Sequence, residues 1–191
     1  MNISSFSRMP FTPKAAWLEL EKVDSLVAKV FWMVVVPLSL LPPIMLYLAG
    51  THYGDVFFAG YSQKPWGIIA VTFFIGEIAS VTLMGWVIKW VAKVWGAQVS
   101  FRNAYLLAAV APIPLWLSSL GLLVASLAFN VALTVIALIL SGGLIFQGVR
   151  SFCHISEIED IGQAAEIARA VFGIGLVAWA LFMSLPVVFS F

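Results

Sequence analysis

The stretch Ala104–Val149, AYLLAAVAPIPLWLSSLGLLVASLAFNVALTVIALILSGGLIFQGV, contains no charged side chain. As one straight helix it would measure roughly 70 Å at about 1.5 Å per residue, more than twice the ~30 Å hydrocarbon core of a bilayer. The stretch must therefore double back, and a tight turn within Gly121–Asn130 is the expected place. A single re-entrant pass would instead put the basic groups that flank the stretch on opposite sides of the membrane, and we reject it because the asymmetry of basic residues would be lost.

The rest of the chain is also strongly apolar. Apolar residues make up 62% of the sequence and charged residues 10%, and the mean hydropathy is +1.05, which lies outside the range of soluble proteins. We therefore predict an all-α, polytopic membrane protein, a single domain over residues 1–191 with five transmembrane helices. The predicted spans are Val30–Ala49, Trp66–Ile88, Ala104–Leu123, Ala128–Val149 and Ala170–Phe189.

The basic residues predict one orientation, because they gather in alternate connections. Lys64 is the one basic residue in the first connection, and the third connection has none. Since cytoplasmic loops carry an excess of Lys and Arg, we expect a cytoplasmic N-terminus and a periplasmic C-terminus. The other nine basic residues would then lie on the cytoplasmic side: Arg8, Lys14, Lys22, Lys29, Lys89, Lys93, Arg102, Arg150 and Arg169.

Residues 1–29 are predicted to form a short amphipathic helix ahead of the first span. Pro13 suits the first turn of a helix, and Ala16, Leu20 and Val23 recur at three- and four-residue spacing. The acidic residues in this segment argue against a cleavable signal peptide. The helix could lie on the cytoplasmic leaflet with its lysines at anionic headgroups, or form a cytosolic cap on the bundle.

Three short motifs resemble a known family. Phe11-Thr12-Pro13-Lys14-Ala15-Ala16-Trp17 is similar to the entry of the Yip (Ypt-interacting protein) domain, in which Trp follows Pro by four residues. Ala111–Leu120, APIPLWLSSL, resembles the proline-containing third span of the bacterial inner-membrane branch of that family. Phe146–Phe152, FQGVRSF, is similar to the exit of the fourth span in that branch. The resemblance implies a small five-span protein of the bacterial inner membrane.

Glu77 is the ionisable side chain that lies deep in a predicted span, roughly 16 Å from Trp66. An acid near the midplane costs roughly 2.5–3.5 kcal/mol on insertion scales, so it should face the bundle and find a partner. We expect a protonated carboxyl that donates to a hydroxyl, an amide or a freed backbone carbonyl. Glu77 could serve a proton-linked or ligand-binding site, or simply hold two helices together.

Prolines interrupt two predicted spans. Pro37, Pro42 and Pro43 lie in the first span, and Pro112 and Pro114 in the third. Each proline removes a helical N–H donor and frees a carbonyl, which a membrane tolerates where protein groups or a cavity supply a partner. The breaks could shape helix packing or help to build a site. We predict a buried polar centre at Glu77 with Pro112, Pro114 and Ser118 on the facing third span.

The connection 150–169 is predicted to be the longest cytoplasmic loop. It could dock a basic partner protein or act as a solvated connector. Cys153 beside His154 lacks the second ligand pair of a zinc site, and no metal site is predicted. The residues of this candidate docking loop are Arg150, Glu157, Glu159 and Asp160.

The sequence carries no nucleotide-binding, metalloprotease or serine-hydrolase motif, so we predict no enzyme and no cofactor.

Small residues such as Gly76, Ser80 and Gly173 suit close helix contacts in lipid. The favoured function is a non-catalytic scaffold or accessory subunit of a membrane complex. Its expected partners are lipids and another membrane protein or a second copy, with no nucleic acid and no assigned small-molecule substrate. The alternative is a small transporter or channel that uses Glu77 and the broken helices.

Overall fold

The computed structural model describes residues 26–57, 59–153 and 161–188, and the regular structure in these ranges is helical. Five helical stretches are long and apolar enough to cross a membrane, which confirms the predicted fold class. They are Val27–Val56, Trp66–Val94, Phe101–Leu123, Leu127–Phe152 and Ile161–Leu181. Most of the predicted amphipathic N-terminal segment, with the motif at 11–17, lies outside the described residues.

The first span is a broken helix. It consists of α3 (Leu26–Val30), the π-helical turn η1 (Phe31–Val35), α4 (Val36–Ser39) and α5 (Leu41–Phe57). The wide turn ends where the N–H of Val36 donates to the carbonyl of Phe31, immediately before Pro37. A proline cannot donate to the helical ladder, so a wider turn ahead of it accommodates the missing hydrogen bond. The interruption predicted from the prolines is thus present in the structure.

The third span is also broken, and the chain reverses where the uncharged stretch was expected to turn. The third span runs through α7 (Phe101–Val110), α8 (Ile113–Ser118) and the 3₁₀ turn η3 (Ser119–Leu123). The break between α7 and α8 falls at Ala111–Pro112. The fourth span, α9 (Leu127–Phe152), begins after Ser126, whose hydroxyl accepts from the N–H of Phe129 and caps the helix.

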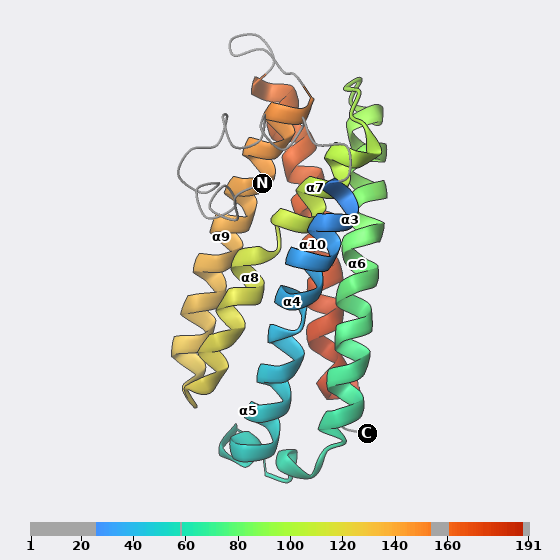
Figure 1. Ribbon diagram of the computed structural model, residues 1–191. Helices are drawn as coiled ribbons and strands as arrows, with labels where there is room; N and C mark the ends of the chain where they lie inside the picture. The colour runs from blue at the N-terminus through green and yellow to red at the C-terminus, as the bar shows by residue number, and fades with distance from the viewer. Residues whose placement is uncertain (1–25, 58, 154–160, 189–191) are drawn as a thin grey trace.

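The two remaining spans are long helices, α6 (Trp66–Val94) and α10 (Ile161–Val188). A short turn, η2 (Tyr61–Gln63), precedes α6. In Figure 1, α8 and α9 lie side by side, and α6 lies on the far side of the bundle from α9. Helix α10 packs against both α6 and α9. The five spans therefore form one helical bundle with α10 joining its two sides.

The tightest packing surrounds α7. Residues 103–111 are all buried, and the cluster around them includes Ala92 of α6 and Ile167 of α10. Gly148 lets α9 approach α7 closely, since a Cβ added there would lie 2.4 Å from the Leu107 side chain. Such close approach through small residues stabilises helix pairs in lipid, where hydrophobic burial adds little.

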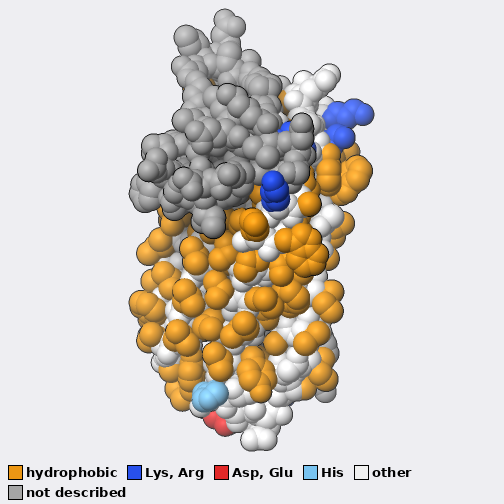
Figure 2. Space-filling model, in the orientation of Figure 1, with side chains coloured by type: hydrophobic (Ala, Val, Ile, Leu, Met, Phe, Trp, Pro, Cys, Tyr) orange, Lys and Arg blue, Asp and Glu red, His pale blue; other side chains and the backbone are white. Residues whose placement is uncertain are grey.

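The outer surface forms an apolar band with charge at its ends. Figure 2 shows hydrophobic side chains over most of the length, with Lys and Arg gathered toward one end. The helix directions agree with this picture, because α6 ends after Lys89 and Lys93 at the end where α9 ends after Arg150. Lys64 lies in the turn before α6, at the opposite end.

Candidate functional site

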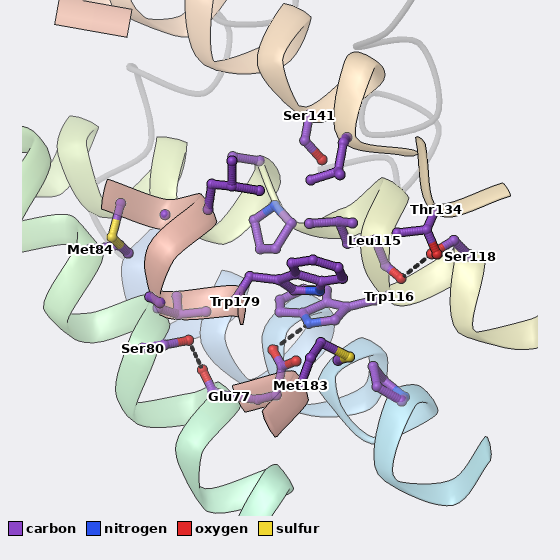
Figure 3. A pocket seen from close by; sticks show the side chains of 18 of the residues that line it. Glu77, Ser80, Met84, Leu115, Trp116, Ser118, Thr134, Ser141, Trp179 and Met183 are labelled. Carbon is purple, nitrogen blue, oxygen red and sulfur yellow. Dashed lines mark hydrogen bonds between the residues drawn. The ribbon is translucent and has the colours of Figure 1, made fainter. Parts of the chain in front are cut away.

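A cavity of about 270 Å³ lies inside the bundle, and all five spans contribute to its wall. Pro42 and Leu46 of α5 line one part, and α6, the α7–α8–η3 segment, α9 and α10 line the rest. The wall is mostly apolar. Its polar side chains include Glu77, Ser80, Ser118 and Ser141, several of which are seen in Figure 3. Ligand sites have this character, a largely apolar pocket with a few placed polar groups.

Glu77 of α6 finds its partner on the third span. The indole N–H of Trp116 donates to Oε2 of Glu77 over 2.6 Å (Figure 3), and Trp116 is only 1% exposed. The short helix α8, which carries Trp116, begins immediately after the break at Ala111–Pro112. The sequence led us to expect an acceptor, yet the observed partner is a donor. Oε2 can accept this bond with or without a proton on the other carboxyl oxygen, so the contact suits either form.

The structure brings together three of the four residues predicted for the polar centre. Glu77, Pro112 and Ser118 line the same cavity, and the hydroxyl of Ser118 donates to the carbonyl of Leu115 over 2.8 Å. Pro114 lies elsewhere, in the wall of a second cavity of about 310 Å³ between α8 and α9. Pro112 and Pro114 are separated by a single residue at the start of a helix, so their side chains face different neighbours.

Trp116, the hydrogen-bond partner of Glu77, was missed by the sequence reasoning. The signal was available: Trp116 lies in the middle of a span, where a buried indole N–H needs an acceptor. Ser141 was also missed, because a serine followed by two glycines, Gly142 and Gly143, is typical of close helix contacts in lipid. Ser141 lines the cavity and is 3% exposed, and its hydroxyl has no hydrogen-bond partner among the described residues.

Comparison with known proteins assigns the chain to a family. The Yip1 domain family matches residues 8–182, nearly the whole sequence. The chain belongs to the Yip1 domain family. Inner membrane protein YohC of Escherichia coli strain K12 is 27% identical to this chain over 155 residues. The aligned region covers 79% of this chain and 77% of YohC. YohC of Escherichia coli O6:H1 gives the same values. No solved structure matches the chain.

Membership of the Yip1 family confirms the resemblance drawn from the sequence motifs. Together with the five apolar helices, the similarity to YohC supports a multi-pass location in the inner membrane. The family match indicates no enzymatic family. Among residues 26–57, 59–153 and 161–188, no three His, Cys, Asp or Glu residues gather where they could hold a metal ion.

The connection predicted at 150–169 is shorter in the structure, because α9 continues to Phe152 and α10 already begins at Ile161, and of the candidate docking residues the structure describes only Arg150, in the last turn of α9. Arg150 is partly buried, with its guanidinium carbon 5.8 Å from the centre of the Phe146 ring. Glu157, Glu159, Asp160 and His154 lie outside the described residues, so the docking loop stays a prediction. Cys153 follows the last turn of α9, and burial raises the pKa of its thiol to about 11.

Proposed function

We propose that this Yip1-family protein works without catalysis, as a scaffold or accessory subunit that contacts another membrane protein or a second copy of itself. The main support for this proposal is a row of small, exposed residues on the outward face of α10. Gly173, Ala180 and Ser184 are exposed there, at spacings of seven and four residues, which place them on one side of a helix. Side chains this small allow a second helix to approach closely in lipid.

The structure shows which small residues of α9 and α10 face the inside of the bundle and which face outward. A Cβ added at Gly142 would meet the Phe172 ring at 3.5 Å, and one added at Gly175 would meet Met84 at 3.7 Å, so both face the bundle. At Gly173 no atom of the described chain outside the backbone of α10 itself lies within 4 Å of that position. The face made by Gly173, Val177, Ala180 and Ser184, here termed the α10 face, is therefore open to a neighbouring helix.

The test is recovery of partners from the native membrane. The tagged full-length protein is extracted into lipid nanodiscs, and mass spectrometry quantifies what copurifies at near-equal stoichiometry. We expect a membrane-protein partner or a second copy that is lost in Ala180→Trp and kept in Ala132→Trp, which adds the same bulk at an exposed alanine of α9. Recovery of the single chain with lipid alone would contradict the proposal.

We also propose an orientation, with a cytoplasmic N-terminus and a periplasmic C-terminus. The support is the charge distribution along the helices. Lys89 and Lys93 at the end of α6, Arg150 at the end of α9 and Arg169 near the start of α10 share one end of the bundle. The positive-inside rule places such an end in the cytoplasm. The predicted docking loop would then meet cytoplasmic partners.

Transport is a second candidate, because the carboxyl of Glu77 lines a cavity beside two broken spans. Ionisable groups within a bundle often mark proton or ion pathways. Glu77→Gln separates the two candidates, since the amide keeps an oxygen that can accept from Trp116 but cannot carry the proton. A proton-coupled transporter would lose flux in proteoliposomes. A scaffold would still fold and recover its partner.

A further inference from the structure

The cavity is elongated along the helix axes. Its wall includes Glu77 to Ile88 on α6, Asn130 to Ile145 on α9, and Val171 to Met183 on α10. At about 1.5 Å per residue these segments extend roughly 16, 22 and 18 Å. The cavity volume of about 270 Å³ exceeds the roughly 150 Å³ that holds a benzene molecule in an engineered protein cavity. A long, narrow space of this size suits a single alkyl chain.

One buried hydroxyl in the wall is left without a partner. Three other lining serines, Ser80, Ser118 and Ser119, donate to backbone carbonyls of their own segments over 2.8, 2.8 and 2.6 Å. Ser141 differs, because no described group bonds to its hydroxyl although the residue is 3% exposed. Figure 3 shows this side chain extending from α9 toward the pocket. A buried polar group in this state favours a ligand that can pair with it.

The surroundings of Ser141 favour an amphipathic molecule over water. Its neighbours in the wall of α9 are Leu138 and Ile145, and Phe172 contributes from α10. A buried water normally needs two to four polar partners, which this apolar part of the wall does not offer. A molecule with a single hydroxyl could pair with Ser141 and place its hydrocarbon part along the apolar wall.

The cavity opens toward lipid. Leu176 and Met183 of α10 both line it and are 37% and 38% exposed. Apolar residues at the opening admit hydrocarbon from the bilayer. The ionisable side chain in the wall, Glu77, already accepts from Trp116, so nothing in the wall requires a charged ligand.

We propose that this cavity binds one uncharged, single-chain amphipathic molecule from the bilayer, with its hydroxyl on Ser141 and its alkyl chain along α6, α9 and α10. The site is distinct from the α10 face, because Gly175 faces inward where Gly173 faces outward. The opening at Leu176 and Met183 borders that face, because both residues lie within four positions of Ala180 on α10, so the site is tested on the purified protein without a partner.

The probe for this site is 3-azioctanol, a photoreactive eight-carbon alcohol, applied to the purified full-length protein in nanodiscs. We expect saturable labelling of peptides from α6 and α9 that 1-decanol suppresses and decane does not. Ser141→Ala removes the hydroxyl without adding bulk, and should weaken the apparent affinity about fivefold, as expected for one lost hydrogen bond. Gly175→Leu should abolish saturable labelling by filling the cavity, whereas Gly143→Leu, its matched control at an exposed glycine of α9 outside the cavity wall, should leave it unchanged.

Several results would overturn the proposal. Labelling that rises without saturation, and equally in Gly143→Leu and Gly175→Leu, would mean that the probe only partitions at the lipid surface. Equal competition by decane would mean that no hydroxyl is recognised, and stronger competition by decylamine would mean that the ligand is charged. If Gly175→Leu does not fold, Ser141→Ala decides: an unchanged affinity in that variant contradicts the assignment.

Discussion

The Glu77–Trp116 hydrogen bond joins the second and third spans at a single pair of side chains. Trp116→Phe keeps the ring but removes the N–H donor, so the carboxyl loses this partner. Interhelical hydrogen bonds in membranes contribute about 0.6 to 1.7 kcal/mol, and we expect a loss of about 1 kcal/mol in the free energy of unfolding. Unfolding in mixed micelles with increasing dodecyl sulfate measures this change.

Trp86→Phe is the matched control for that prediction. Trp86 is 59% exposed on α6, and the same substitution there should cost less than about 0.5 kcal/mol. Equal losses in the two variants would show that the effect comes from the ring and not from the hydrogen bond to Glu77.

The reactivity of the Cys153 thiol should depend on pH in a way that reports its burial. Cys153 is the one cysteine in the chain, and burial raises its pKa to about 11, so the thiol is protonated at neutral pH. Because the thiolate is the reactive form, the rate of alkylation by iodoacetamide should rise about tenfold per pH unit between about pH 7 and 10. A rate that levels off near pH 9 would show that the thiol has an ordinary pKa.

At the scale of single elements, glycine contacts set how closely the helices pack. Gly50 of α5 lies against the ring of Trp66 at the start of α6, and an added Cβ would lie 2.1 Å from Cε2 of that ring. Trp66 is 3% exposed and its indole N–H donates to the carbonyl of Tyr61 over 2.8 Å, so it cannot easily move away.

Gly50→Ala should therefore destabilise the protein by about 1–3 kcal/mol, the usual cost of overpacking. Gly67→Ala is the control, since among the described residues no atom outside its own helical backbone lies within 4 Å of the position that its Cβ would take. Heating in detergent followed by size-exclusion chromatography compares the two. A loss of folded protein that is equal in both variants would show that α5 and α6 do not meet as described.

The elements were largely predictable from the sequence, and the site was predictable only in part. Apolar length and proline position predict spans and breaks because both act locally on the backbone. Glu77 was identified because a charge in lipid is costly wherever it points. Trp116 and Ser141 could not be assigned to the same cavity, since that depends on the rotation of each helix about its axis. An apolar run without a polar face does not specify this rotation.

At the scale of the whole molecule, the charge at the two ends predicts the orientation. Alkaline phosphatase fused after Phe191 should be active in the periplasm, and a cysteine placed at Gln63 in a Cys153→Ser background should react with a membrane-impermeant maleimide from outside. A cysteine placed at exposed Gln98, in the connection between α6 and α7, should stay unreactive to the same reagent until the membrane is opened. The opposite pattern would contradict the proposed orientation.

If the protein acts through contacts of its α10 face, a photocrosslinker on that face will capture the partner in the living membrane. A photoreactive benzoylphenylalanine replaces Ala180, or Ala132 as the control on α9, and the cells are irradiated. We expect a discrete crosslinked protein species from position 180 and none from position 132. Crosslinks to lipid alone at position 180, or the same protein products from both positions, would contradict it.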